Sequence, residues 1–231
     1  MKKSEQLGRR EFLKSLGGGL GLVAVASHLP SSASGADESQ RAVKRDPAAL
    51  KRLIDSMDTR GHRHSSVPRK EGEFLNLMVK ATRVRSVLEV GTSQGYSAIW
   101  IGLGLEETGG RLATIEIDAE RHELARKNVS EAGLSQRITL IKGDAHAEVP
   151  RLEGPFDFVF LDADKEGQMD YFKKLYPRKL SPGAILAVHN AISQASSMRD
   201  YLDMIRKHPE FDTVVLSVTM DDGFCLSYRH R

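Results

Sequence analysis

The segment from Val84 to Leu105 constrains the fold of this chain more than any other stretch. It opens with a short aliphatic run, Val84 to Val90, typical of a central parallel strand that is covered on both faces. Gly91 and Gly95 then bracket a turn, and a helix-like run follows. A glycine after the strand permits a tight turn, and the helix presents free N–H groups to the same crevice. The segment therefore predicts a strand–turn–helix unit with a ligand site at its turn.

The glycine spacing at this turn indicates which ligand the site can take. A dinucleotide-binding turn has the pattern G-x-G-x-x-G, whereas this one reads E-x-G-x-x-x-G, with Glu89 still on the strand. No second glycine stands at the position that a pyrophosphate needs. A carboxylate at Glu89 suits a cationic amino-acid group better than a diphosphate. An ordinary βα turn without a ligand is the alternative interpretation.

The run VLEVGTSQGYSAIW, from Val87 to Trp100, resembles the first motif of class I S-adenosylmethionine (SAM) methyltransferases, specifically the catechol and caffeoyl-CoA O-methyltransferase group. The resemblance continues from about Ser66 to the C-terminus. It implies a Rossmann-like, doubly wound α/β fold whose seven strands follow the order 3-2-1-4-5-7-6, with strand 7 antiparallel and helices on both faces. It also implies transfer of a methyl group from SAM to a hydroxyl of a small phenolic or catechol-like acceptor.

Strand-like and helix-like runs alternate after the central unit, which predicts a doubly wound parallel sheet with right-handed crossovers. The expected strands lie at 111–117, 138–141, 156–161 and 184–188. The expected helices lie at 47–57, 70–82, 119–132, 169–180 and 197–208. Two final apolar runs, 213–219 and 224–228, are joined by Met220-Asp221-Asp222-Gly223, which is a hairpin signal. The tail is therefore expected to add an antiparallel pair to the sheet.

Residues 1–36 resemble a twin-arginine export signal more than a part of the fold. The Arg9-Arg10 pair precedes an apolar, glycine-rich run at 16–29 that is too short to span a membrane comfortably. We expect cleavage after Ala36, with Ala33 as the alternative, so that the mature protein is periplasmic and keeps no stable membrane insertion. An amphipathic first helix is the rival interpretation, and a leader that does not function would leave the protein in the cytoplasm.

Charge and cysteine content limit which partners the mature chain can have. The leader holds five of the 34 Lys and Arg residues and two of the 31 Asp and Glu residues, which leaves 29 of each sign. A net charge near zero argues against a nucleic-acid partner. Cys225 is the only cysteine, which excludes an intrachain disulfide and a thiolate metal site. We expect a flexible linker at 37–46 and one methyltransferase domain at 47–231, with a homodimer as an open option.

In open α/β sheets, ligands bind beyond the carboxyl ends of the strands, so the residues after each expected strand are the informative ones. Glu116, at the end of the second strand, is placed to accept hydrogen bonds from both hydroxyls of a ribose. The resemblance implies that Ser97 and the free N–H groups near it bind the methionine carboxylate. It implies that SAM is held by Val67, Glu89, Gly91, Ser97, Glu116, Asp144, Ala145 and Asp162. Tyr96 either lines the methyl-transfer pocket or packs in the core, and we favour packing.

The resemblance also implies a divalent metal, usually magnesium, held by an aspartate after strand four and an aspartate–asparagine pair after strand five, with a nearby lysine as general base. Asp162 and Asn190 match the ligands, Lys165 matches the base, and His189 stands where the family has aspartate. An imidazole removes one negative charge and favours manganese, iron or zinc over magnesium. One hypothesis is an altered metal held by Asp162, His189 and Asn190, and a second is a weakened site. The third is metal-free transfer with His189 or Lys165 as base.

The sequence leaves room for weaker alternatives. A nicotinamide-dependent oxidoreductase of Rossmann type is disfavoured by the G-x-x-x-G turn and by the terminal hairpin. An exported SAM-binding protein without turnover is the stronger rival, because SAM is made in the cytoplasm and an exported enzyme needs a supply. His62 and His64 lack a third ligand of matching spacing, so a solvated or substrate-facing loop is expected there instead of a metal site.

Overall fold

The computed structural model describes residues 45–60, 65–219 and 221–231. The export signal expected at 1–36, most of the expected linker, and His62 and His64 lie outside these ranges. Within the described part of the chain, no helix has both the length and the apolar character that crossing a bilayer requires.

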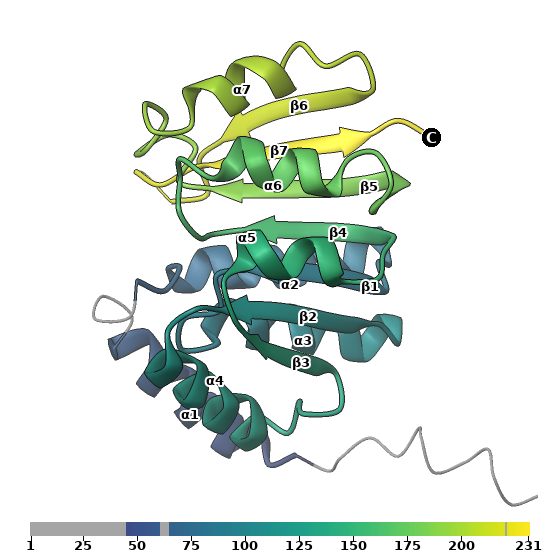
Figure 1. The fold of residues 1–231 in the computed structure, drawn as a ribbon. Coiled ribbons are helices and arrows are strands. Elements are labelled where there is room, and N and C mark those ends of the chain that lie inside the picture. The colour runs from purple at the N-terminus through teal and green to yellow at the C-terminus, as the bar shows by residue number, and fades with distance from the viewer. Residues whose placement is uncertain (1–44, 61–64, 220) are drawn as a thin grey trace, which may run out of the picture. The chain divides into compact units, whose positions relative to one another are not determined.

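Seven strands form one sheet in the order β3-β2-β1-β4-β5-β7-β6. Their bounds are β1 Ser86–Val90, β2 Arg111–Glu116, β3 Ile138–Lys142, β4 Phe156–Leu161, β5 Leu180–His189, β6 Phe211–Leu216 and β7 Phe224–Arg229. The first five strands pair in parallel, and β7 pairs antiparallel with both β5 and β6. Figure 1 shows this single sheet with β4 in its middle. The strand order and the antiparallel strand confirm the predicted fold class.

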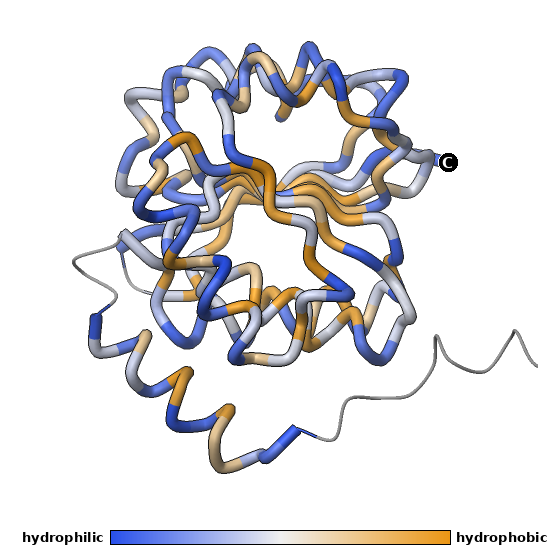
Figure 2. Tube along the Cα trace, turned by 60° about the horizontal axis from the view of Figure 1, so that its bottom comes forward, coloured by the Kyte–Doolittle hydropathy of each residue, from blue (hydrophilic) through white to orange (hydrophobic). Residues whose placement is uncertain are grey.

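Helices cover both faces of the sheet. In Figure 2 the strands cross the middle of the view, and helices lie above and below them. Their bounds are α1 Pro47–Arg60, α2 Arg69–Thr82, α3 Tyr96–Thr108, α4 Ala119–Glu131, α5 Ala145–Glu148, α6 Gln168–Leu175 and α7 Arg199–Ile205, with a 3-10 turn at Val149–Arg151. In Figure 1, α5 and α6 lie in front of the sheet and α2 and α3 behind it. Successive side chains of a strand point to opposite faces. Phe158 and Phe160 of β4 therefore join the core under α1 to α3, and Val159 and Leu161 join the core under α6 and α7.

Gly91 and Gly95 shape the turn between β1 and α3. Gly91 has a φ of 98°, and a Cβ at this position would lie 2.5 Å from the carbonyl oxygen of Asp162. Gly95 has a φ of 85° and stands directly before α3, close to Ala125 of α4. Both positions need glycine, because other residues rarely adopt this backbone conformation. Gly91 therefore lets the turn approach the residue that follows β4, and Gly95 lets the start of α3 approach α4.

The boundary between α6 and β5 differs from the sequence expectation. α6 ends at Leu175, well before its expected end, because Tyr176 precedes Pro177 and takes an extended conformation with a ψ of 141°. β5 begins at Leu180, earlier than expected, because this leucine is buried and pairs with Phe156 of β4. α7 is also shorter than predicted. These corrections change the far end of the sheet and leave the carboxyl ends of the strands as expected.

Candidate active site

A cavity of about 860 Å³ opens at the carboxyl ends of β1, β2, β4 and β5. Its walls come from the turn between β1 and α3, the end of β2, the loops after β3, β4 and β5, and the loop before α2. The strand order changes direction between β1 and β4, which is where open α/β sheets bind their ligands. We therefore identify this cavity as the candidate active site.

Most of the residues predicted from the sequence meet at this cavity. Those predicted for SAM that line it are Val67, Gly91, Ser97, Glu116, Asp144, Ala145 and Asp162. Those predicted for catalysis or metal binding that line it are Lys165, His189 and Asn190. Glu89 is the exception, because it lies behind the cavity wall with no exposed surface. Tyr96 both packs and lines the cavity: it is 2% exposed and donates from its hydroxyl to Asp58 at 3.2 Å.

Glu116 is held in place by backbone amides on both sides of its carboxylate. The amide of Ser93 donates to Oε2 at 2.7 Å, and the amide of Asp118 donates to Oε1 at 2.9 Å. The side chain is 6% exposed and borders the cavity. Each carboxylate oxygen can accept more than one hydrogen bond, so Glu116 can still receive two hydroxyls from a ligand.

Glu89 is a buried carboxyl group that is not ion-paired with a cation among the described residues. Its Oε2 accepts a hydrogen bond from Thr114 at 2.5 Å, and the hydroxyl of Ser97 also hydrogen-bonds to it. Burial raises the pKa of Glu89 to about 8, and the two hydroxyl groups only partly oppose this shift. Ser97 lines the cavity and hydrogen-bonds to Glu89, so Glu89 would interact with a cationic ligand group through Ser97.

Asp162 lies at the centre of a cluster of opposite charges. Its Oδ1 is 2.8 Å from Nζ of Lys165 and 2.9 Å from Nδ1 of His189. Burial raises the pKa of Asp162, but the charges of His189 and Lys165 outweigh it and lower the pKa below its usual range. Burial likewise lowers the pKa of His189, but Asp162 and Glu71 on either side of the ring raise it to about 9.

The three residues expected to hold a metal border the same cavity. Nδ1 of His189 and Oδ1 of Asp162 are 2.9 Å apart, at hydrogen-bond distance. Asn190 has a φ of 59° and donates from Nδ2 to Asp222 at 3.0 Å. The metal site expected from Asp162, His189 and Asn190 stays a prediction, with His189 held between the Asp162 and Glu71 carboxylates.

Sequence reasoning missed three residues at this end of the molecule. Glu71 falls within the helix expected at 70–82, with no role predicted for it, yet it is fully buried and 2.8 Å from Nε2 of His189. Asp222 was read only as a turn residue, and it lines the cavity. His146 stacks on Tyr171 with ring centroids 4.3 Å apart and also lines the cavity. An acidic residue on the apolar face of α2 was the only local signal for Glu71.

The sheet order, the antiparallel β7 and a cavity at the change of strand order together define the class of the protein as a Rossmann-like methyltransferase fold. The chain belongs to the O-methyltransferase family, whose profile matches residues 39–228. This match covers nearly all of the described chain, including six whole strands of the sheet and all of β7 except Arg229.

Curated relatives and solved structures support this assignment. A catechol O-methyltransferase from Mycobacterium tuberculosis is 33% identical over 197 residues, which cover 79% of this chain and 89% of the relative. The O-methyltransferase from Bacillus cereus in complex with SAH superimposes with a TM-score of 0.71 at 26% identity, covering 81% of this chain and 93% of that one. The SAM-bound O-methyltransferase TomG from Streptomyces achromogenes gives a TM-score of 0.69 at 28% identity, with 84% and 94% coverage.

Proposed function

We propose that this protein is a SAM-dependent O-methyltransferase that methylates a hydroxyl of a small phenolic or catechol-like acceptor. The observation that carries the proposal is a single cavity that joins Glu116 and the start of α3 to the charged cluster around Asp162. Membership of the O-methyltransferase family supports the reaction class. The SAM- and SAH-bound relatives support the cofactor, and the catechol O-methyltransferase of M. tuberculosis supports the acceptor class.

The side of the cavity formed by β1, β2 and β3 is proposed to hold SAM. Glu116 accepts the two ribose hydroxyls, and Gly91 allows the backbone to approach the ligand closely. Ser97 and the free N–H groups at the start of α3 bind the methionine carboxylate. Asp144 and Ala145 border the adenine, and Val67 and Asp162 complete the enclosure.

The side formed by β4 and β5 is proposed to hold the acceptor. Its oxygen attacks the methyl carbon of SAM, the carbon–sulfur bond breaks, and the products are a methyl ether, S-adenosylhomocysteine and a proton. Lys165 is 8% exposed and lines the cavity, so its charge can stabilise the acceptor oxygen as that oxygen loses its proton. His189 acts by positioning Asp162, which in turn holds Lys165 in place. Proximity of the two bound reactants supplies much of the remaining rate enhancement.

Calorimetry with SAM, followed by a turnover assay, tests the proposal. We expect one SAM per chain and, with a panel of catechols and phenols, a methylated product detected by mass spectrometry. Binding of SAM with no product from the panel would favour a binding protein without turnover. Binding of a reduced nicotinamide dinucleotide in place of SAM would contradict the proposal and support the oxidoreductase alternative.

We further propose that residues 1–36 export the protein to the periplasm. The support is the Arg9-Arg10 pair ahead of an apolar run, since the export receptor reads the arginines as an address. Replacing both arginines with lysine should retain the precursor in the cytoplasm, whereas replacing Lys2 and Lys3 with arginine should not. Fractionation and immunoblotting measure this. If the variant with lysine at positions 9 and 10 is processed and found in the periplasmic fraction, the arginine pair is not the export signal.

A further inference from the structure

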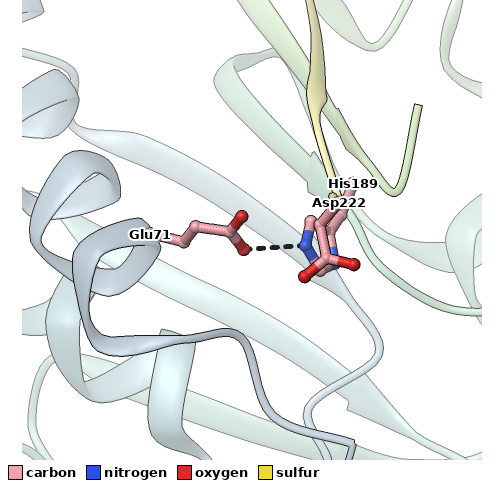
Figure 3. A group of neighbouring side chains, drawn as sticks. All are labelled: Glu71, His189 and Asp222. Atoms are coloured by element: carbon pink, nitrogen blue, oxygen red, sulfur yellow. Dashed lines mark ion pairs between the residues drawn. The ribbon is translucent and has the colours of Figure 1, made fainter. Parts of the chain in front are cut away.

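Three ionisable side chains from distant parts of the chain meet at the wall of the acceptor side of the cavity. They are Glu71 on α2, His189 at the end of β5 and Asp222 in the loop between β6 and β7 (Figure 3). One ligand atom from each lies within 4.8 Å of the other two. Glu71 is fully buried and His189 is 5% exposed. Figure 3 shows the Glu71 carboxylate directed at the imidazole ring, with Asp222 beside the same ring.

Glu71 and His189 form a buried ion pair. Oε2 of Glu71 lies 2.8 Å from Nε2 of His189, and neither atom has a further partner among the described residues. When the imidazole gives up its Nε2 proton, this nitrogen and the Glu71 oxygen each offer a lone pair, and the Asp222 carboxylate offers a third ligand atom. A divalent cation can therefore take the place of the proton between them.

The other polar atoms of the three side chains are already positioned by neighbours. These bonds are Thr219 Oγ1 to Glu71 Oε1 at 2.6 Å, His189 Nδ1 with Asp162 Oδ1 at 2.9 Å, and Asn190 Nδ2 to Asp222 Oδ1 at 3.0 Å. Metal ligands in proteins are oriented by such outer partners, and a carboxylate behind a ligating histidine is a common one. The cluster therefore has candidate ligand atoms and, behind them, the hydrogen-bonding neighbours that would orient these ligands.

We propose that Glu71, His189 and Asp222 bind one divalent transition-metal ion, such as Mn²⁺, Fe²⁺ or Zn²⁺. One imidazole and two carboxylates favour these ions over Mg²⁺, which prefers oxygen ligands only. On binding, the ion replaces the proton that the carboxylates hold on His189, as is usual for histidine ligands. The ion ties α2 to the loop before β7 and thereby fixes the wall of the acceptor side. Only His189 is shared with the ligand set that the family resemblance implies.

Direct metal binding tests the proposal without reference to methyl transfer. The full chain is freed of metal with a chelator and titrated separately with MnCl₂, ZnCl₂ and MgCl₂, and bound metal is counted by elemental analysis after dialysis. We expect one Mn²⁺ or Zn²⁺ per chain and weaker Mg²⁺ binding. Glu71→Gln and Asp222→Asn should each weaken binding about tenfold or more. The matched controls are Glu73→Gln, exposed on the same helix, and Asp221→Asn, exposed in the same loop.

Two outcomes overturn the proposal. The first is a wild-type chain that binds neither Mn²⁺ nor Zn²⁺ in stoichiometric amount, which would make the cluster a buried ion pair. The second is binding that persists unchanged in both ligand variants, which would place the ion elsewhere, for example on His62 and His64. Thermal melting in metal-free buffer checks that Glu71→Gln folds. Asp222 is less buried than Glu71, so Asp222→Asn gives an independent reading.

Discussion

Glu89 and Asp162 stand at the ends of neighbouring strands, and burial acts on both, yet their pKa values shift in opposite directions. Burial raises the pKa of Glu89 to about 8, because its partners are hydroxyl groups and no cation. Burial also raises the pKa of Asp162, but the adjacent His189 and Lys165 charges reverse the shift. The difference shows that neighbouring charges, more than depth in the fold, decide whether a carboxyl group at this edge of the sheet is ionised.

The same contrast divides the cavity into two regions. The cofactor region consists mainly of backbone groups, glycines and hydroxyls, with Glu116 held by two amides. The acceptor region consists of paired charges: Lys165 and His189 pair with Asp162, and Glu71 pairs with the far side of the His189 ring. A region of fixed hydrogen-bond donors and acceptors suits recognition of an invariant cofactor. A region of buried charges suits a step in which charge develops on an oxygen.

The largest expected effect comes from removing a cation from the acceptor region. Lys165→Ala should lower turnover by about 10²- to 10³-fold, the usual loss when a stabilising group is removed from a reacting oxygen. SAM affinity should stay nearly unchanged, because the cofactor region is intact. Kinetic assays and SAM calorimetry on the same preparations measure the two effects, with exposed Lys173→Ala as control. Equal loss of SAM affinity and turnover would show that the two regions are not separate.

A smaller effect is expected from neutralising the buried carboxyl of the cofactor region. Because the folded-state pKa of Glu89 is raised from 4.5 to about 8, its contribution to stability is fully present below pH 4.5 and is lost as the pH rises through about 8. Without SAM, the wild type should therefore lose a few kcal/mol relative to Glu89→Gln over this range. Urea unfolding of both proteins at several pH values gives the difference, with exposed Glu120→Gln as control.

The comparison with Asp162 fixes the sign of this prediction. The pKa of Asp162 is lowered, so its contribution to stability is present above pH 3.8 and is lost as the pH falls. Asp162→Asn should therefore flatten the acid side of the stability profile, whereas Glu89→Gln flattens the neutral side. Profiles that change on the same side for both variants would refute the contrast between the two regions.

The smallest of these effects concerns cofactor recognition. Glu116→Ala should weaken SAM binding by roughly 1 to 3 kcal/mol, because two ribose hydroxyls lose their acceptor. The measurement is calorimetry at constant pH, and exposed Glu131→Ala, at the end of α4, is the matched control. Unchanged affinity in Glu116→Ala would rule out the ribose-binding role and move the cofactor away from the end of β2.

Local patterns sufficed for most of the sheet and for the cofactor region. The aliphatic run ending at Val90 and the glycines of the turn are adjacent in sequence, and Glu116 closes its own strand, so local patterns indicate each of them. The end of α6 differs from the expected one, because Pro177 forces Tyr176 out of the helical conformation.

The chain by itself determined the order of elements, the family motif and the departure at His189. Only the tertiary structure decided what His189 does, because Glu71 and Asp222 lie far from it in sequence and meet it only when α2 and the loop before β7 pack at one edge of the sheet. The physical reason is that ionisation and metal binding depend on charges a few ångströms away in space. Sequence spacing alone carries little information about those distances.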